Sequence, residues 1–317
     1  MAHWLKWLLA VAMVTTLSAC GDDDDDPPHP GPGNIVEVAQ ANGFTALTAA
    51  ATKAGLVATL SSSSANLTVF APTDAAFGAL ATRLGFANAD AMVQALPAAA
   101  LANILNYHVL PARRTAAQLA AGGATQATAY TFAGAPTTLA LNTTTGVVIT
   151  DAALTTARVS TADVAASNGV VHAIDKVLVP PGVLNVVQMA QVNPLFSSLV
   201  GAVVQANLQG TLSGAGPFTV FAPTNDAFAA IASTVAGLNN AQLTTVLTYH
   251  VLPAQVLAAD IPFGTPVATV AAQNITINQT PLTITDTTAT PAPIVATNVR
   301  ASNGVIHVIG KVLIPAL

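Results

Sequence analysis

Thr68-Val-Phe-Ala-Pro-Thr-Asp-Ala-Ala-Phe77 decides the fold, because the chain repeats it 151 positions later (219 − 68) as Thr219-Val-Phe-Ala-Pro-Thr-Asn-Asp-Ala-Phe228. Two further blocks recur in the same order. Tyr107-His-Val-Leu-Pro-Ala112 returns at Tyr249, an offset of 142 (249 − 107), and Ala166-Ser-Asn-Gly-Val-Val-His172 returns as Ala301-Ser-Asn-Gly-Val-Ile-His307, an offset of 135 (301 − 166). The second copy is therefore shorter by nine residues and then by seven more, and we expect these deletions in surface loops.

The repeated unit is long enough to be a domain. The copies open at Asn34 and Asn185 and close at Pro180 and Pro315, so each has an ordinary domain length. A repeat of this length predicts two domains in tandem and not a solenoid. We therefore expect module 1 at residues 34–180 and module 2 at residues 185–317.

The first block predicts a joint between a strand and a helix. A β-branched and aromatic run is typical of a strand, and a proline ends it in both copies. Thr73 and Thr224 then offer hydroxyl N-caps, and Asp74 and Asp226 stand in the first helical turn, where a negative charge favours the helix dipole. Apolar side chains continue one helix face at positions 77, 80 and 84, and again at 228, 231 and 235.

The second block places a tyrosine and a histidine near the end of a helix. His108 and His250 follow apolar residues at spacings of a single helix face, which predicts buried, neutral imidazoles hydrogen-bonded to the backbone. We expect Tyr107 and Tyr249 to be half-buried, each with a partner for its hydroxyl group.

The third block has the pattern of a hairpin. Asn168-Gly169 and Asn303-Gly304 favour type I′ turns between strands, and His172 and His307 fall on the same strand face as apolar neighbours. Thr/Val-rich runs at 146–150 and 274–278 predict further antiparallel strands. Each module should therefore be α+β, with helices in its first half and a sheet or sandwich in its second.

Residues 1–20 form a targeting segment. A charged start, a short apolar run and Leu17-Ser18-Ala19-Cys20 resemble the signal peptide and lipobox of bacterial lipoproteins, which implies lipidation of Cys20 and a membrane as partner. A plain secretory signal is the alternative. Cys20 is the only cysteine, so no disulfide can form within the chain.

Residues 21–33 link the targeting segment to module 1. Five aspartates followed by a Pro/Gly-rich run predict a solvated, extended tether, with an acidic calcium or sorting signal as the alternative. The resemblance to lipoproteins implies that Gly21 favours the outer membrane. We therefore expect a cell-envelope location, on either the periplasmic or the external face.

Charge limits the classes of function. Only 7% of residues are charged, against roughly 25% in typical proteins, and 34–180 carries six acidic and six basic residues. No cationic stripe is available for nucleic acid. The six histidines show no metal-ligand spacing, Glu37 is the only glutamate, and hydrolase and P-loop motifs are absent, so we expect no metal, no cofactor and no enzyme activity. A Ser167–His172–Asp175 site is the weaker alternative, since glycine replaces Asp175 at position 310.

The three repeated blocks together resemble the fasciclin domain family, over 34–315. The resemblance implies a compact α+β module, a wedge-shaped β-sandwich with packed helices. It also implies that Tyr107, His108, Tyr249 and His250 fall on the Tyr-His motif, which is linked to integrin adhesion in animal members. His172 and His307 fall on the second conserved stretch of the family, and Thr73 and Thr224 on its first. Helical phase favours burial of the Tyr-His motif over direct contact with a partner.

Three functions stay open. The first is a non-catalytic adhesion or protein-interaction module that contacts an unidentified protein or matrix partner, and whose two copies gain avidity. The second is a periplasmic or surface protein that binds or senses a small ligand in an apolar pocket between sheet and helices. The third is a hydrolase. The resemblance places adhesion first.

Overall fold

The computed structural model describes residues 31–317. The expected signal peptide, Cys20 and most of the expected tether lie outside the described residues. Residues 32–317 form one compact unit. Within the described part of the chain, no single helix is long and apolar enough to cross a membrane. One pair of helical segments, Val186–Val192 and Pro194–Gln205, reaches that length and apolarity only when the two are taken together, and a bend of 107° separates them.

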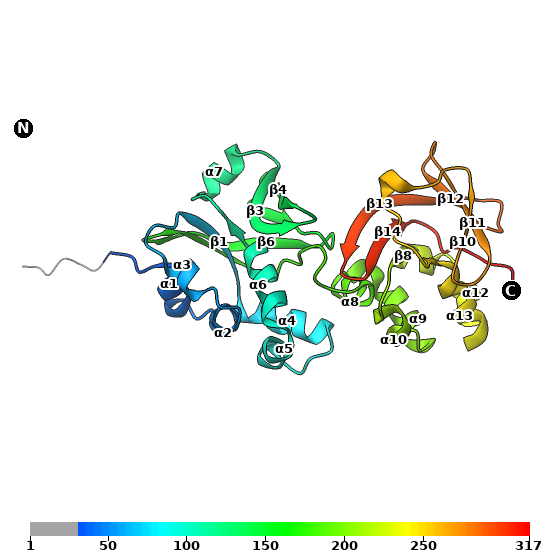
Figure 1. Cartoon of the computed structure of the whole chain (residues 1–317), viewed down its shortest axis with the longest axis horizontal. Helices are drawn as coiled ribbons and strands as arrows, with labels where there is room; N and C mark the ends of the chain where they lie inside the picture. The colour runs from blue at the N-terminus through cyan, green and yellow to red at the C-terminus, as the bar shows by residue number, and fades with distance from the viewer. Residues whose placement is uncertain (1–30) are drawn as a thin grey trace, which may run out of the picture. The chain divides into compact units, whose positions relative to one another are not determined.

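Both modules begin with helices (Figure 1). Module 1 contains α1 (Ile35–Ala41), α2 (Thr45–Lys53), α3 (Val57–Ser61), α4 (Asp74–Arg83), α5 (Ala89–Ala95), α6 (Ala98–Tyr107) and α7 (Ala116–Ala121). Module 2 contains α8 (Val186–Val192), η1 (Pro194–Phe196), α9 (Ser197–Gln205), α10 (Gln209–Ser213), α11 (Asn225–Ala229), α12 (Ala232–Ala236), α13 (Asn240–Tyr249) and η2 (Ala258–Asp260).

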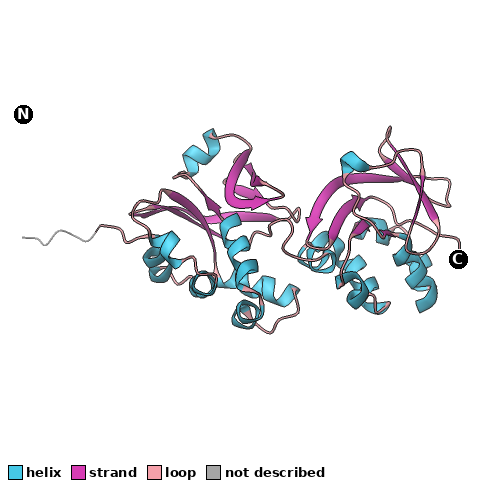
Figure 2. Ribbon diagram, in the orientation of Figure 1, coloured by secondary structure: helices cyan, strands magenta, loops and turns pink. Residues whose placement is uncertain are grey.

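Each module also contains seven strands, which occur in the same order along the chain. Figure 2 shows the strands in magenta. Module 1 contains β1 (Leu67–Pro72), β2 (Val109–Leu110), β3 (Thr125–Phe132), β4 (Ala135–Asn142), β5 (Val148–Thr150), β6 (Thr156–Ala166) and β7 (Gly169–Ile174). Module 2 contains β8 (Phe218–Pro223), β9 (Val251–Leu252), β10 (Pro266–Ala268), β11 (Asn274–Asn278), β12 (Thr283–Thr285), β13 (Ala292–Ala301) and β14 (Gly304–Ile309).

The first and last strands of each module lie side by side. The strand order is β2-β1-β7-β6-β5-β4-β3 in module 1 and β10-β11-β12-β13-β14-β8-β9 in module 2. The β1–β7 and β8–β14 pairs are parallel, and all the others are antiparallel. The sequence predicted the antiparallel strands but not the parallel pair, because the paired segments are far apart in the chain and no local pattern links them.

A long strand in each module, β6 or β13, pairs with strands of both layers of the sandwich. The ladders of β6 with β7 and of β13 with β14 each contain two register shifts. Asp163 and Asn298 lie within these irregular stretches, with left-handed φ angles of 59° and 62°. Asp and Asn tolerate this region better than other non-glycine residues, and bulges bend a strand. This bend produces the expected sandwich.

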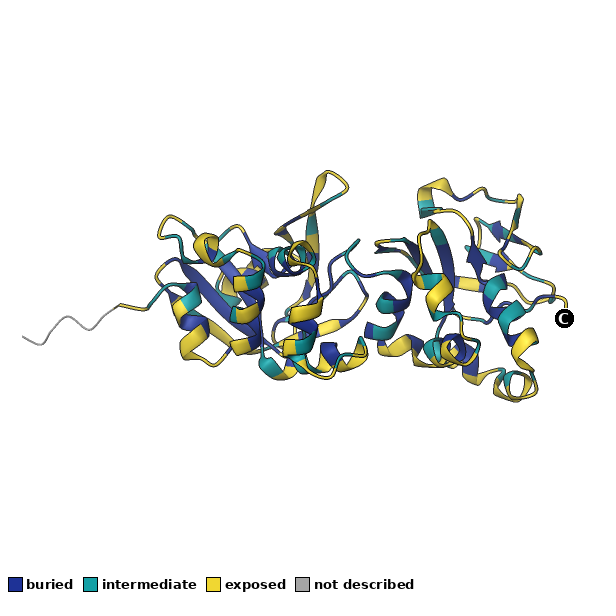
Figure 3. Cartoon of the chain, turned by 60° about the horizontal axis from the view of Figure 1, so that its bottom comes forward, coloured by how far each residue is buried: buried dark blue, intermediate teal, exposed yellow. Residues whose placement is uncertain are grey.

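Apolar side chains fill the interior in two places. Figure 3 colours the buried residues dark blue along the ribbon. Between the two strand layers lies one cluster per module, with Phe70, Leu139 and Ile149 in module 1 and Phe221, Ile277 and Ile284 in module 2. A larger cluster lies between the sheets and the helices. The Tyr-His helix α6 supplies side chains to both kinds of cluster, Leu105 to the helical side and Tyr107 to the strand side.

The Asn-Gly pairs do not form type I′ turns. Ala166 pairs directly with Gly169, so the two-residue loop is Ser167-Asn168, and neither loop residue has a positive φ. Gly169 is needed for a different reason, since a Cβ atom there would collide with the carbonyl oxygen of Leu67 on the parallel strand. The same explanation holds at Gly304, whose Cβ would meet the carbonyl oxygen of Phe218.

Asn168 connects the hairpin to the first helices. Its Oδ1 accepts the N–H of Ile35 at 2.9 Å, and its Nδ2 donates to the carbonyl oxygens of Leu60 and Ser62 at 2.8 and 2.9 Å. Asn303 repeats these bonds in module 2. The side chain that suggested a turn therefore joins distant backbone segments.

The first deletion shortens helices and does not fall in a loop. Three helices lie between the first and second blocks of each module, α4, α5 and α6 in module 1 and α11, α12 and α13 in module 2. α4 has ten residues and α5 seven, whereas α11 and α12 have five each. The continuous helix face that the sequence predicted over positions 228, 231 and 235 is therefore interrupted between α11 and α12.

Candidate functional site

The Tyr-His motif lies at the end of α6, inside the module. His108 is the residue that follows the helix, and it is 1% exposed. Its Nδ1 lies 2.7 Å from the carbonyl oxygen of Ile104, and its Nε2 accepts the backbone N–H of Leu178 at 2.8 Å. Because Nε2 is an acceptor, Nδ1 carries the proton and donates to Ile104, and the ring is neutral.

Module 2 repeats this arrangement. Nδ1 of His250 lies 2.7 Å from the carbonyl oxygen of Val246, and Nε2 accepts the N–H of Leu313 at 2.8 Å. Burial lowers the pKa of both imidazoles, His108 and His250, from 6.5 to about 4. Burial disfavours the charged form, and only the neutral ring can accept the N–H bond.

In each module, an aspartate accepts a hydrogen bond from the residue that follows the histidine's backbone partner. Asp151 is 4% exposed. Its Oδ1 accepts the N–H groups of Ala153 and Thr155 at 3.1 and 2.8 Å, and its Oδ2 accepts the Thr155 hydroxyl at 2.7 Å and the Val179 N–H at 3.0 Å. Burial raises the pKa of Asp151 despite these bonds.

Asp286 is the equivalent residue in module 2, 135 positions later (286 − 151). Its Oδ2 accepts the N–H of Ile314 at 2.9 Å, and its Oδ1 accepts the N–H and hydroxyl of Thr288. It also forms an ion pair with Lys311 at 2.9 Å. Burial alone would raise the pKa of Asp286, but the hydrogen bonds from Thr288, Lys311 and Ile314 lower it overall.

Each module therefore holds its exit segment by two side chains. The exit segments, residues 177–180 and 312–315, follow the last strand and belong to no helix or strand, yet they are largely buried. In each, two consecutive backbone N–H groups find a histidine nitrogen and an aspartate oxygen. Buried N–H groups outside regular structure need such acceptors.

The tyrosines of the motif are more deeply buried than the sequence suggested. Tyr107 and Tyr249 are 1% and 0% exposed, not half-buried. Their hydroxyl groups donate to the carbonyl oxygens of Thr138, at 3.3 Å, and Asn274, at 2.9 Å. Burial raises the pKa of Tyr107, so the hydroxyl stays protonated. The structure thus places the Tyr-His pair in the interior.

His172 and His307 lie in the last strand of each module and are fully buried. Each stacks on a phenylalanine of the parallel strand, with ring centroids 5.7 Å apart. Nε2 of His172 lies 2.9 Å from the carbonyl oxygen of Arg114, and Nδ1 accepts the N–H of Asp163. Nε2 of His307 contacts Val256 in the same way, but its Nδ1 has no partner among the described residues.

The alternative Ser167–His172–Asp175 site does not assemble. His172 is turned toward Arg114 and Asp163, as described above. Asp175 instead accepts the N–H of Arg158 at 2.7 Å. Within residues 31–317, no hydrogen bond joins any two members of this triad, and no group of three metal-ligating side chains comes together.

Thr73 and Thr224 cap the helices that follow them. Their hydroxyl oxygens accept the N–H groups of Ala76 and Ala227 at 3.2 and 3.3 Å. Asp74 stands in the first turn of α4 and has a second role, which is to bond the start of α2. Its carboxylate accepts the N–H of Ala46 at 2.9 Å and the Thr45 hydroxyl. In module 2, Asn225 takes this second role and Asp226 stays exposed in the first turn.

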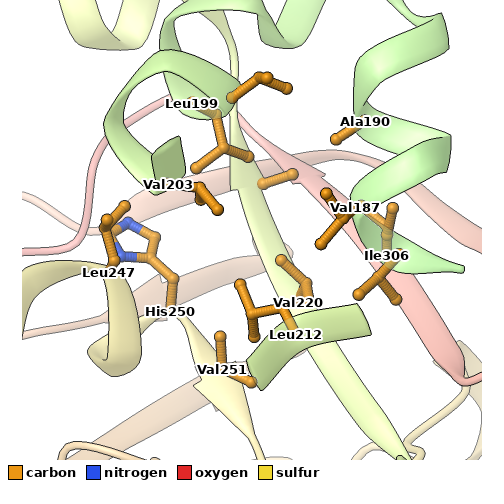
Figure 4. A pocket seen from close by; sticks show the side chains of 13 residues that line it. Val187, Ala190, Leu199, Val203, Leu212, Val220, Leu247, His250, Val251 and Ile306 are labelled. Carbon is orange, nitrogen blue, oxygen red and sulfur yellow. The ribbon is translucent and has the colours of Figure 1, made fainter. Parts of the chain in front are cut away.

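An apolar cavity lies between helices and sheet at the same place in each module. Figure 4 shows the cavity of module 2, where side chains from α8 and α9 face those of β8 and β14, with His250 at one side. Its equivalent in module 1 includes His108. Each cavity has a volume of about 30 Å3, which is room for little more than a water molecule.

Fold and site together define the class of protein. Two α+β modules hold their motif side chains inside, and the polar groups of those side chains are bonded to backbone.

The Fasciclin domain model matches residues 42–180 and 194–315, so this chain belongs to the fasciclin domain family.

Known proteins resemble single domains of this chain. Protein sll1483 of Synechocystis sp. is 44% identical over 139 residues, which cover 42% of this chain and 75% of that protein. Transforming growth factor-beta-induced protein ig-h3 of Sus scrofa is 33% identical over 154 residues, which cover 47% of this chain but only 22% of ig-h3. Among solved structures, the FAS1 domain pair of the insect cell adhesion molecule fasciclin I covers 89% of this chain, at 19% identity and a TM-score of 0.43.

The sequence reasoning missed Asp151 and Asp286. Both follow a Thr-rich strand and stand outside the three repeated blocks, in a region where the two copies differ in length. Alignment by the third block, an offset of 135 positions, does bring the two aspartates and also Lys176 and Lys311 into register. An aspartate at the same aligned position in both copies was therefore the sequence signal that could have identified Asp151 and Asp286.

Proposed function

We propose that this protein is a lipid-anchored cell-envelope protein whose two fasciclin domains act as a non-catalytic adhesion or interaction module. Fasciclin domains are found in adhesion proteins, among them fasciclin I. The observation that supports the proposal most is the interior position of the Tyr-His pairs and the aspartates, whose polar groups bond to the module's own backbone. The surface is then the part of each module that meets a partner.

The anchor rests on Cys20 and its lipobox. Each buried CH₂ group contributes about 0.8 kcal/mol to membrane binding, and two acyl chains suffice for stable anchoring. The tether, residues 21–33, would let the modules stand up to about 45 Å from the membrane surface. Two modules on one tether favour weak contacts strengthened by effective concentration.

The charge of the surface constrains the partner. Module 2 has three acidic and two basic residues, and one pair of these, Asp286 and Lys311, is internal. The charges left to meet a partner in module 2 are Asp226, Asp260 and Arg300. Contact through module 2 therefore depends on hydrogen bonds from Thr, Ser and Asn and on apolar groups, and we expect adhesion through this module to depend only weakly on salt.

Attachment of cells tests this function. Cells that lack the protein should attach to partner cells or matrix less than cells that carry it, and normal attachment of those cells would contradict the proposal. Cys20→Ser should release the protein from the membrane fraction and lower attachment equally. Removal of 185–317 should lower attachment far more than twofold if the two modules act together.

A further inference from the structure

A cavity of about 190 Å3 lies beside the end of β7, the last strand of module 1. One wall is the apolar face of α4, formed by Ala76, Ala79 and Leu80. The lining continues with Thr156, Val177 and Val179 of module 1 and with Val192, the last residue of α8 in module 2. Three charged side chains complete it, Arg83, Asp175 and Lys176. An apolar cavity of about 150 Å3 is enough to hold benzene. The cavity of module 1 therefore has room for a ligand of several heavy atoms.

Lys176 differs from its counterpart in module 2. Lys311 is fully engaged: its Nζ donates to both oxygens of Asp286, to the Thr288 hydroxyl at 2.5 Å and to the carbonyl oxygen of Thr290 at 2.7 Å. Among the residues that the structure describes, Nζ of Lys176 has no hydrogen bond and no ion pair.

The cause lies in the loop that faces the lysine. Alanine stands at position 153, where module 2 has Thr288, so the hydroxyl acceptor is lost. Asp151 directs its two oxygens to Ala153, Thr155 and Val179 instead. The ammonium group of Lys176 therefore lines the cavity, and its N–H groups are available to a ligand.

The other two charges of this cavity also belong to module 1 alone. Gly310 stands where module 1 has Asp175, and the helices α11 and α12 of module 2 contain no arginine or lysine. Nη1 of Arg83 donates to the carbonyl oxygen of Val192 at 3.2 Å, and its other guanidinium N–H groups are available to a ligand. Oδ1 of Asp175 accepts the N–H of Arg158, and Oδ2 has no hydrogen-bond partner among the described residues.

Two cations, one anion and an apolar wall therefore surround the same space. Burial lowers the pKa of Lys176, the charges of Asp151 and Asp175 oppose this change, and nearby Arg83 adds to it. A simple anion such as phosphate would meet the Asp175 carboxylate unfavourably. A ligand with both an anionic and a cationic group matches all three charges.

We propose that this cavity binds a small α-amino acid with an aliphatic side chain. The ligand carboxylate lies between Lys176 and Arg83, and its ammonium group donates to Oδ2 of Asp175. The aliphatic side chain packs against Ala76, Ala79 and Leu80 of α4. Module 2 has neither Arg83 nor Asp175 and uses its lysine internally, so the chain binds one ligand and not two.

Titration of the full-length protein with L-valine and three analogues tests the proposal. Isovalerate lacks the amino group, isobutylamine lacks the carboxylate, and glycine lacks the aliphatic side chain. Isothermal titration should give one site for L-valine and binding at least about tenfold weaker for each analogue, because each loses one group of contacts. No binding of L-valine at millimolar concentration, or equal binding of isovalerate, would overturn the proposal.

Substitutions assign the site. Lys176→Gln, Arg83→Gln and Asp175→Asn should each weaken L-valine binding at least about tenfold, and Lys176→Arg should restore most of it. Arg113→Gln is the matched control, because it removes an exposed positive charge away from the cavity. Unchanged melting temperatures show that the variants fold. Unaltered affinity in Lys176→Gln places any binding elsewhere and refutes the assignment.

Discussion

Nε2 of His108 accepts the backbone N–H of Leu178 at 2.8 Å, across 70 residues of sequence. The bond joins the end of helix α6 to the segment by which the chain leaves module 1. His250 and Leu313 form the same bond in module 2, across 63 residues. The histidine of the Tyr-His motif is thus a structural link between the helical half and the exit segment of each module.

Removal of this link should destabilise the module that contains it. We expect His108→Ala to lower the free energy of unfolding by about 2–4 kcal/mol, because it leaves a cavity and an unsatisfied N–H group at Leu178. His250→Ala should act equally on module 2. Calorimetry of the full chain measures both losses, with Arg113→Ala as the exposed control. A variant that loses adhesion while it keeps its melting temperature would instead indicate direct contact of His108 with a partner.

Stability should fall as the pH drops from 6.5 toward 4. The folded histidines titrate at about 4 and the unfolded ones near 6.5, so within this window the unfolded chain binds more protons. Each histidine then lowers the free energy of unfolding by up to about 1.4 kcal/mol per pH unit, which amounts to about 3 kcal/mol per histidine over the whole window. The lowered pKa of Asp286 adds a loss at still lower pH, whereas the raised pKa of Asp151 acts in the opposite sense.

Urea unfolding across this pH range tests the assignment. His108→Gln keeps an acceptor for Leu178 but cannot take up a proton, so its stability should vary less with pH than that of the wild type. A variant with the same pH dependence as the wild type would show that His108 does not titrate in this window.

Gly169 and Gly78 should respond in opposite ways to alanine. Gly169→Ala places a Cβ against the carbonyl oxygen of Leu67, so we expect a loss of about 3 kcal/mol or more as the parallel strands separate. Gly78 lies within α4 with open space around it, and alanine there should add about 0.5–1 kcal/mol through helix propensity. Chemical denaturation of both variants gives the comparison. If the two substitutions had the same sign, the close approach of the strands would not be the reason for Gly169.

The two equivalent lysines should differ in their importance for stability. Lys311→Met leaves the buried carboxylate of Asp286 without its ion pair, and we expect a loss of about 2 kcal/mol or more. Lys176→Met breaks no hydrogen bond among the described residues, so its unfolding free energy should change by less than about 0.5 kcal/mol. Thermal unfolding of the two variants distinguishes them, and equal losses would mean that Lys176 also has a structural partner.

Much of the fold could be predicted because the chain contains two versions of it. Features kept in both copies indicated a strand that leads into a capped helix, a helix that ends at the Tyr-His pair, and a final hairpin. The errors arose where a local pattern had a distant cause. Asn168-Gly169 resembled a turn, yet Asn168 holds Leu60 and Ser62, and Gly169 makes room for Leu67.

The sequence by itself determined the tandem of two fasciclin domains and the apolar side of α6, because repetition and helical period are written along the chain. The tertiary structure alone decided the partner of each buried polar group. It gave His108 the N–H of Leu178, gave Asp151 that of Val179, and left Lys176 at a cavity. Such pairings join residues that are far apart in the chain, and the need to satisfy every buried N–H group selects them only once the core has closed.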